Sequence, residues 1–447
     1  MRSSLAIGLV LIGFSSWPAN AQDPPPPTDP AAAERARLEA ELKAEMAAPP
    51  EDSGGTTAPA APRGGAAQTS LLDLSFDLLT AAGGSSADDS RIELLEQGDH
   101  DPHRRGFTIQ NFEITGTGVV DPYFSGEVHL VLKLDRLAET TLELEEAFLT
   151  TAALPGGLQV KAGQMFEAFG RQNPQHPHAW AFVDHTVVGS RFLGPDGLRS
   201  QGVEVSWLAP TPWFLLLTGG VYNANGGTEY SFVNEDAPPL YANATPREVS
   251  SPADLQYVAR LATNLDFGDT VSSTLGASYA HGPNSTGPGA DTDLFGADLY
   301  LRWKPLATDQ GWPFLAFQAE WMGRSYHVAG GTDTGGAAHD EQTLFDWGYY
   351  AQLVWGFHTR WTAGVRWDQA LGKNARDYPE SGLLNPRQRV SPALTFYPSE
   401  FSKLRLQYNF DHETLFDPET RADSTKNDHS VWIQFEFLLG KHGAHKF

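Results

Sequence analysis

The chain carries a strongly alternating stretch near its end, residues 428–438, which reads DHSVWIQFEFL. Apolar side chains occupy every second position from Val431 to Phe437, and the positions between them hold Trp432, Gln434 and Glu436. Successive side chains of a strand point to opposite faces, so this stretch predicts a β-strand with one apolar face. An amphipathic, aromatic-rich strand is typical of an outer-membrane β-barrel.

Residues 1–21 predict export through a cleaved signal peptide. Arg2 gives the positive start, residues 5–14 form an apolar run, and Ala19-Asn20-Ala21 is a small-residue cleavage site. The alternative, a membrane anchor, needs about 20 apolar residues, more than this run provides. We therefore expect cleavage after Ala21 and a protein located in a bacterial, Gram-negative outer membrane.

The composition excludes several classes of protein. The chain has no cysteine, so a disulfide framework, thiol catalysis and thiolate metal sites are excluded. Its formal net charge is −24, and it has no basic stripe. We therefore expect no nucleic-acid partner, because nucleic-acid binding needs clustered positive charge.

Residues 22–70 predict a periplasmic segment that precedes the barrel. Residues 22–30 are rich in proline and predict an extended chain. Residues 31–48 favour a short helix, and residues 49–69 favour a flexible linker rich in Gly, Ala and Pro. Two interpretations of the helix stay open: an oligomerisation helix, or a solvated linker helix.

Residues 71–447 predict the barrel itself, an all-β fold. Sixteen segments have the length and pattern of membrane-crossing strands. They are residues 71–79, 106–119, 123–134, 141–150, 157–165, 199–208, 213–222, 255–267, 271–281, 294–304, 312–322, 346–357, 360–370, 388–397, 403–411 and 429–438. We therefore expect a transmembrane antiparallel β-barrel of about 16 strands.

The connections between these segments alternate in length. Every second one is a short turn, such as residues 120–122, 268–270 and 358–359. The others include the long stretches 80–105, 166–198, 223–254, 323–345, 371–387 and 412–428. Short periplasmic turns and long outer loops are the asymmetry of bacterial outer-membrane barrels.

The second face of the predicted strands is polar and should line a wet lumen, because an interior of this size is too wide for side chains to fill. The predicted lumen-lining charges include Lys161, Arg260, Arg302, Lys304, Glu320, Arg366, Asp368 and Arg405. Positive and negative charges nearly balance, and no arginine ladder is evident. The alternative is a solvated wall without a specific site.

The connection of residues 166–198 is long and rich in proline, aromatic and ionisable residues. Such a loop can fold into a large barrel and narrow its pore, whereas the alternative is an ordered surface loop. The candidate pore-constriction residues are Arg171, His176, His178, Asp184, His185 and Arg191.

Histidines occur in three close pairs: His100 and His103, His176 and His178, and His442 and His445. Imidazoles at this spacing can share a zinc or copper ion, but two ligands without a third are a weak signal. His100, His103, His176 and His178 are therefore weak metal candidates, with ordinary polar loop residues as the alternative. No cofactor is predicted, and no motif of a hydrolase or a metalloprotease is present, so we expect no enzyme.

Taken together, the layout resembles that of general porins, and more narrowly the phosphate-selective porin O and P family. The resemblance covers residues 71–447 and includes LEEAFL at 144–149 and LQVKAGQ at 158–164. In that family a similar strand pair leads into the constriction loop, and the resemblance implies a trimer. The stretch from Phe169 to His178 also looks like barrel proteins described as zinc-regulated outer-membrane receptors.

These observations predict a porin that forms a water-filled channel for passive diffusion of small hydrophilic solutes or ions. The alternatives are a substrate-specific or zinc uptake barrel, and a structural or adhesive outer-membrane barrel. The expected partners are outer-membrane lipid and lipopolysaccharide, the transported solutes, the barrel assembly machinery and, as a homotrimer, further copies of the chain.

Overall fold

The computed structural model describes residues 72–134, 139–152, 154–234, 247–332, 338–372, 385–417 and 422–440. The predicted signal peptide, the predicted helix and linker of residues 22–70, and the pair His442 and His445 lie outside these residues.

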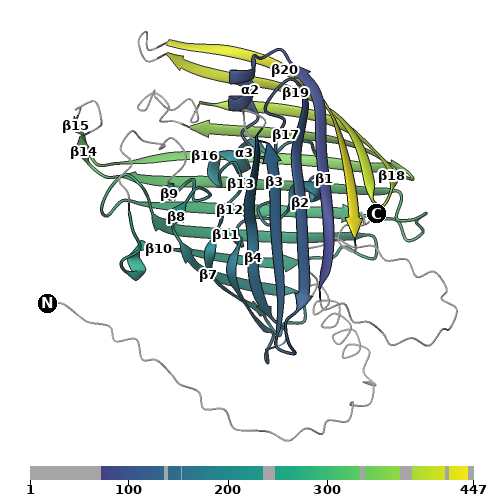
Figure 1. Cartoon of the computed structure of the whole chain (residues 1–447), viewed down its shortest axis with the longest axis horizontal. Coiled ribbons are helices and arrows are strands. Elements are labelled where there is room, and N and C mark those ends of the chain that lie inside the picture. The colour runs from purple at the N-terminus through teal and green to yellow at the C-terminus, as the bar shows by residue number, and fades with distance from the viewer. Residues whose placement is uncertain are drawn as a thin grey trace, which may run out of the picture. The chain divides into compact units, whose positions relative to one another are not determined.

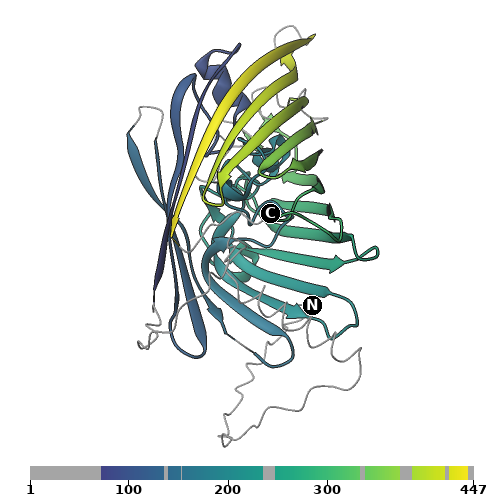
Figure 2. The same cartoon turned by 90° about the vertical axis from the view of Figure 1, so that its right-hand side faces the viewer.

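Sixteen antiparallel strands form one closed barrel, as the sequence predicted (Figures 1 and 2). Their order around the barrel follows the chain, and β20 pairs with β1 to close it. The strands are β1 (Asp73–Ser85), β2 (Gly106–Val119), β3 (Phe124–Leu134), β4 (Thr140–Thr151), β5 (Leu158–Phe166), β6 (Arg199–Leu208), β7 (Leu215–Asn223), β10 (Leu255–Asn264), β11 (Val271–Pro283), β12 (Asp291–Trp303), β13 (Phe314–Val328), β16 (Gln342–His358), β17 (Trp361–Gly372), β18 (Arg387–Ser399), β19 (Ser402–Asp417) and β20 (Ala422–Gly440).

Short elements lie in the long connections. They are α2 (Asp89–Leu95), η1 (Pro177–Ala179), α3 (Val187–Phe192), β8 (Asn225–Gly226), β9 (Val233–Asn234), η2 (Pro252–Asp254), β14 (Gly331–Thr332) and β15 (Ala338–His339). The Asp88 side chain caps α2 by accepting a hydrogen bond from the Arg91 amide. Among the described residues, the helices are too short or too polar to cross a membrane.

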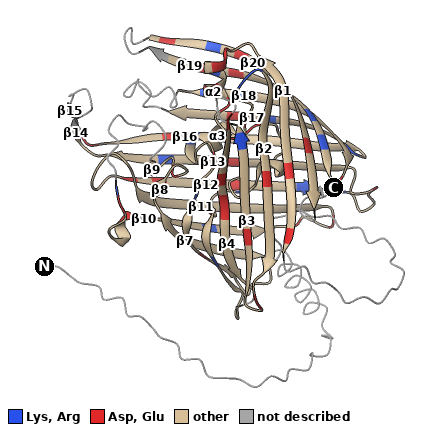
Figure 3. Ribbon diagram, viewed as in Figure 1, with Lys and Arg blue, Asp and Glu red and all other residues tan. Residues whose placement is uncertain are grey.

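The strands alternate an apolar outward face with a polar inward face. On β20, Val431 and Ile433 are 45% and 49% exposed, whereas Gln434 and Glu436 are almost completely buried. Acidic residues recur along β1 to β4, where Figure 3 shows them in red. The outward apolar face is the arrangement that a barrel needs in contact with lipid.

Two β-bulges interrupt this alternation and add polar residues to the interior. On β2, Leu79 pairs with Asn111 and Thr80 with Ile109, so that Gln110 is the extra residue. As a result, Gln110 and Asn111 are both buried. A bulge lets two consecutive side chains face the same side of a sheet, which strict alternation cannot predict.

The second bulge lies on β4. His129 pairs with Glu146 and Leu130 with Leu144, so that Glu145 is the extra residue. Glu145 and Glu146 are both buried in consequence. Strict alternation would turn only one of these two neighbouring carboxylates to the interior.

The connection of residues 167–198, between β5 and β6, folds into the barrel. Its apolar side chains build a hydrophobic core with inward residues of the wall. The loop contributes Phe169, Val188, Phe192, Leu193 and Leu198, and the wall contributes Phe148, Met165, Tyr222, Val258, Ala280, Leu294 and Met322. At this level the loop covers the inward side chains of the wall, so this part of the face that the sequence predicted to be wet is buried under the loop.

Inward glycines make room for this loop. A Cβ atom at Gly296 would lie 3.0 Å from the Phe169 ring, and one at Gly364 would lie 3.3 Å from the Phe182 ring. Both distances are shorter than ordinary van der Waals contact. The wall is thus shaped to receive the loop, and α3 packs against β13, β16 and β17.

Candidate channel constriction

The loop of residues 167–198 is anchored to three parts of the wall. The first is the wall of β17, β18 and β19, which presents arginines inward. Asp184 is completely buried there, and it accepts hydrogen bonds from Arg366 at 2.7 Å and Arg389 at 2.6 Å. Gln407 and Asn409 each donate a further bond to it at 2.8 Å. Burial alone would raise the pKa of the Asp184 carboxyl, but Arg366 and Arg389 hold it well below its usual range.

The same wall also binds the backbone of the loop. Arg405 donates to the carbonyl of Phe182 at 2.8 Å and to that of Trp180 at 2.9 Å. Lys403 donates to the carbonyl of His178. A buried carbonyl group without a hydrogen-bond partner costs free energy. These cations therefore stabilise the backbone path of the loop, in addition to compensating its negative charge.

A segment of the connection between β1 and β2 completes this network. Glu96 accepts two hydrogen bonds from Arg389, at 2.6 and 3.0 Å. Burial raises the pKa of Glu96 to about 7, against the lowering effect of Arg389. Arg389 also contacts Asp411 at 2.9 Å, so one guanidinium joins two loops to two strands.

The second anchor lies on β11 and β13. Glu320 accepts hydrogen bonds from the amides of Arg171 at 2.9 Å and Gln172 at 2.8 Å. The Ser278 hydroxyl accepts one from the Gly170 amide at 3.0 Å. The guanidinium of Arg171 lies over the Tyr300 ring, 4.0 Å from its centre, and stays partly exposed to the interior space.

The third anchor lies on β2, β3 and β4. The His176 ring is buried between carboxylates, with Nδ1 2.9 Å from Glu145 and Nε2 3.0 Å from Glu146. Burial opposes a charge on this ring, but Glu113 and Glu145 raise the pKa of His176 well above its ordinary value. Residues at the middle of the loop therefore contact opposite parts of the wall.

Inside the loop, the start of α3 is held by its own side chains. Thr186 caps the helix by accepting from the Gly189 amide, and the Ser190 hydroxyl lies 2.9 Å from His185 Nδ1. Burial, and then the charge of Arg366, lower the pKa of His185 to about 3. Burial also lowers the pKa of Arg191 to about 10, and this side chain donates to the carbonyl of Asn385.

The six predicted constriction residues all lie on the loop inside the barrel. His176, His178, Asp184, His185 and Arg191 are buried, and Arg171 is partly exposed. They do not meet at one point. Asp184 and His176 contact different walls, and Arg171 contacts a third.

The eight predicted lumen-lining residues all point inward, but four of them do not face water. Glu320, Arg366, Asp368 and Arg405 are at most 2% exposed because the loop covers them. Lys161, Arg260, Arg302 and Lys304 are partly exposed and line the interior nearer the short turns. The sequence pattern gives the direction of a side chain and does not show what covers it.

The arginine cluster was not visible in the linear sequence. Arg366, Arg389 and Arg405 lie on three successive strands, and strand register brings them together. Asp368 pairs with Arg389, and Thr395 pairs with Arg405. Glu113 and His129, which contact the loop near His176, were also missed, because only the register of β2 with β3 reveals that they are neighbours.

The rings of His176 and His178 are stacked, with their centroids 5.7 Å apart, and both lie near Glu113. Among the described residues, three-dimensional groups of possible metal ligands combine His176 with His129, His178 with Asp77, and His100 with Asp196. His103 belongs to none of these groups. The spacing in the sequence therefore indicated that His176 and His178 are neighbours but did not indicate their acidic partners or His129.

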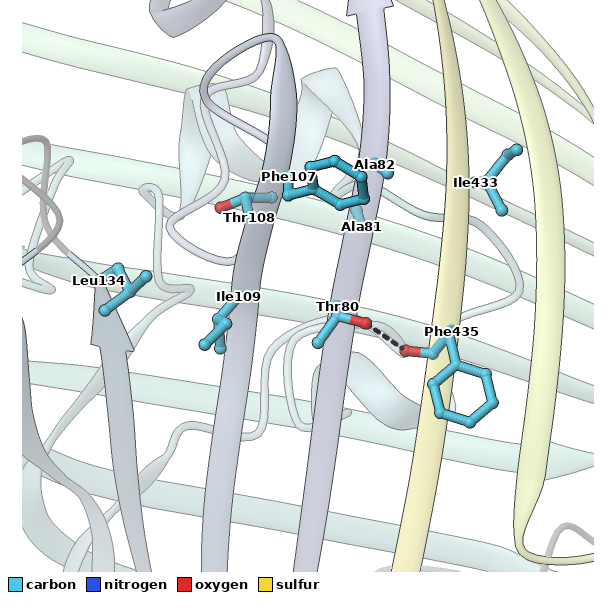
Figure 4. A pocket seen from close by; sticks show the side chains of 9 residues that line it. All are labelled: Thr80, Ala81, Ala82, Phe107, Thr108, Ile109, Leu134, Ile433 and Phe435. Atoms are coloured by element: carbon cyan, nitrogen blue, oxygen red, sulfur yellow. Dashed lines mark hydrogen bonds between the residues drawn. The ribbon is translucent and has the colours of Figure 1, made fainter.

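A shallow pocket on the outward face lies between β1, β2 and β20 (Figure 4). Phe107, Ile109, Ile433 and Phe435 line it and are all exposed. It lies over the bulge at Gln110, where the Thr80 hydroxyl donates to the carbonyl of Phe435 at 3.4 Å. This pocket faces away from the interior, so it is not a site for a solute inside the barrel.

Comparisons with known proteins support the fold. No family model matches the chain. An uncharacterized protein of Aquifex aeolicus (strain VF5) is 31% identical over 404 residues, which cover 84% of this chain and 80% of that protein.

Two solved structures share the fold at low sequence identity. The outer membrane channel DcaP of Acinetobacter baumannii has a TM-score of 0.52 and 11% identity, over 82% of this chain and 97% of that one. OprB of Pseudomonas putida has a TM-score of 0.51 and 10% identity, over 82% of this chain and 94% of that one.

Proposed function

The chain belongs to the same family as the uncharacterized Aquifex aeolicus protein, and we propose that it forms a water-filled diffusion channel of a bacterial outer membrane. The observation that carries this proposal is a closed 16-stranded barrel with an apolar outside, a polar inside and a long loop folded into it. Barrels of this size enclose an aqueous space when their interior is polar.

The outward face supports a membrane location. Exposed apolar and aromatic side chains recur on every second position, and charged side chains lie on the opposite face. A soluble protein would leave this apolar surface in contact with water at a large cost in free energy. The predicted signal peptide of residues 1–21 and the predicted periplasmic segment of residues 22–70 agree with this location.

We propose that the loop of residues 167–198 limits passage. It occupies the barrel at the level of Asp184, and the partly exposed charges Lys161, Arg302 and Lys304 lie nearer the short turns. A solute would pass these cations and Arg171 before or after the narrowest part of the channel, depending on the direction in which it crosses the membrane. Passage is then screened by size and charge, and no chemical reaction is involved.

Liposome swelling with a graded series of neutral sugars tests this proposal. We expect the purified chain to admit small sugars and to exclude large ones. A variant that lacks residues 174–186 should admit larger sugars, because it loses the part of the loop that contacts Arg366, Arg389 and Arg405. Failure of both proteins to admit any solute, while they are folded in the bilayer, would favour the structural or adhesive alternative.

The ion preference, the oligomeric state and the partners of the channel are part of the same proposal. The sign of the reversal potential in a salt gradient would give the ion preference, which the nearly balanced interior charges do not set. Block of the current by phosphate would test the resemblance to the phosphate-selective porin O and P family. A homotrimer, contact with lipopolysaccharide and insertion by the barrel assembly machinery are expected of such a channel. Crosslinking in native membranes would test the trimer.

A further inference from the structure

A buried group of imidazoles and carboxylates joins the loop to the wall. Glu113 of β2, His129 of β3, Glu145 of β4 and His176 of the loop each direct one possible ligand atom to a common point, and these atoms all lie within 4.8 Å of one another. The four side chains are between 1% and 4% exposed. The bulge on β4 lets Glu145 and its neighbour Glu146 both face this side of the sheet.

The distances suit a small cation. His176 Nδ1 lies 2.9 Å from Glu145 Oε2 and 3.4 Å from Glu113 Oε2, and His129 Nδ1 lies 2.6 Å from Glu113 Oε1. Ligands of a tetrahedral zinc ion lie about 3.3 Å apart, because each is about 2.0–2.1 Å from the metal. Small shifts of side chains would therefore close the group around an ion.

Each histidine also has the outer partner that metal-binding imidazoles usually have. His129 directs Nε2 to Glu127 at 2.6 Å, and His176 directs Nε2 to Glu146 at 3.0 Å. A carboxylate on the far nitrogen fixes the tautomer of a ligating histidine and orients the ring toward the metal. The Thr115 hydroxyl donates to Glu113 at 2.8 Å and orients that carboxylate in the same way.

Some atoms that point into the group lack a hydrogen bond. Among the described residues, Glu113 Oε2, Glu145 Oε2 and His176 Nδ1 are buried and have no hydrogen-bond partner apart from ion-pair contacts with one another and with His178. Buried carboxylates need a compensating charge. Lys161 lies 3.8 Å from Glu146, at the edge of the group, and a divalent cation at its centre would place positive charge between Glu113 and Glu145.

We propose that Glu113, His129, Glu145 and His176 bind one divalent transition-metal ion of the zinc class, which fastens the loop to the wall. Two imidazoles favour zinc and its neighbours over calcium and magnesium, which prefer oxygen ligands alone. Because all four side chains are buried, the ion would stay bound as a structural part of the protein and would not be a transported solute. The proposal does not depend on whether the barrel conducts.

Metal titration of the full chain in detergent tests the proposal. The protein is purified without a polyhistidine tag and stripped with a chelator, and every variant also carries His442→Ala and His445→Ala, which remove the histidine pair outside the described residues. Zn²⁺ binding is measured by calorimetry, and Co²⁺ binding by its visible absorption. We expect one ion per chain and a tetrahedral Co²⁺ spectrum.

The variants distinguish Zn²⁺ binding at this site from Zn²⁺ binding at other histidines. His176→Gln and Glu145→Gln should each weaken Zn²⁺ binding by at least tenfold, and Glu127→Gln should weaken it by about 10–100-fold through the outer partner. His327→Gln is the matched control, because His327 pairs with Glu341 at 2.9 Å in an outer loop hairpin and should leave binding unchanged.

Heat-modifiable mobility on gels shows that each variant has a folded barrel, and His176 is suited to this test because it lies on the loop and not on a strand. Bound Zn²⁺ should also slow proteolysis of the loop in the parent chain and not in His176→Gln. A folded parent chain that binds no Zn²⁺, or that binds it as tightly after His176→Gln and Glu145→Gln, would overturn the proposal.

Discussion

Asp184 holds the interior loop to the wall through two buried ion pairs and two further hydrogen bonds. It is completely buried and bonded to Arg366, Arg389, Gln407 and Asn409. Removing one partner of a buried ion pair leaves the other charge uncompensated, which costs about 3–5 kcal/mol. The barrel strands pair without Asp184. Its replacement should therefore reduce the free energy of loop docking and leave strand pairing intact.

We therefore expect Asp184→Asn to undock the loop without unfolding the barrel. Amide hydrogen exchange should become much faster in residues 167–198 and stay slow in the strands. Asp89→Asn is a suitable control, because Asp89 and Arg105 are an exposed pair 3.0 Å apart and such pairs contribute at most about 1 kcal/mol. Equal protection of the loop in Asp184→Asn and the parent chain would show that this network does not hold it.

At the scale of the loop, His185 links docking to pH. Burial and Arg366 lower its pKa to about 3 in the docked loop, whereas an undocked imidazole has a pKa of about 6.5. Below pH 6.5 the undocked loop binds a proton that the docked loop does not. The contribution of His185 to docking is therefore fully present above that pH and is lost as the pH falls from about 6.5 toward 3, whereas His176, whose pKa is raised in the docked loop, contributes with the opposite sign as the pH rises.

His185→Gln should remove this part of the pH dependence. Hydrogen exchange or proteolysis of the loop, measured from pH 7 to pH 4, gives the comparison. The lowered pKa values of Asp184 and Asp196 weaken docking with the same sign at lower pH, so the difference between the two proteins isolates the histidine. An identical pH profile in both proteins would exclude His185 as the titrating group.

At the scale of a strand, the two faces of β16 should differ in what they tolerate. Leu353 is 37% exposed on the outward face, and Gln352 is its inward neighbour. Arginine on the lipid face near the bilayer midplane costs about 2–4 kcal/mol, whereas arginine on the lumen face contacts water. We expect Leu353→Arg to lower the yield of assembled barrel and its unfolding midpoint, and Gln352→Arg to change both much less. If Gln352→Arg lowered the yield and the unfolding midpoint more than Leu353→Arg, the assignment of the two faces would be reversed.

The sequence predicted the strands well because their signal is local. Alternation over about ten residues is enough to define a strand, and the segments 106–119 and 199–208 agree with β2 and β6 to the residue. The largest differences lie at the outer ends, where β20 begins at Ala422 and β13 ends at Val328. Strand pairing continues there through polar residues without an apolar face.

The site was less predictable because it depends on contacts between distant residues. The loop and its six candidate residues were identified by composition, but their partners were not. Glu146 is inside because of a bulge, and Arg389 meets Asp184 because of strand register and the path of the loop. Neither a bulge nor a register has a marker in a single sequence.

At the scale of the whole molecule, the chain forms a closed barrel whose interior is narrowed chiefly by the loop of residues 167–198. The wall and the loop are held together by charged groups of both signs, so the loop is a part of the folded interior and not an appendage. Removal of the loop should leave the barrel closed, because each strand still pairs with both of its neighbours. The size of the passage then depends on the loop and on the segments packed with it, among them those that carry Glu96 and Phe232.

Single-channel conductance in planar bilayers shows whether the loop narrows an open channel. We predict discrete openings from the full chain, and clearly larger openings from the variant that lacks residues 174–186, with both proteins shown to be folded by heat-modifiable mobility. Equal conductance of the two proteins would contradict a constricting loop, and silence from both would contradict a channel.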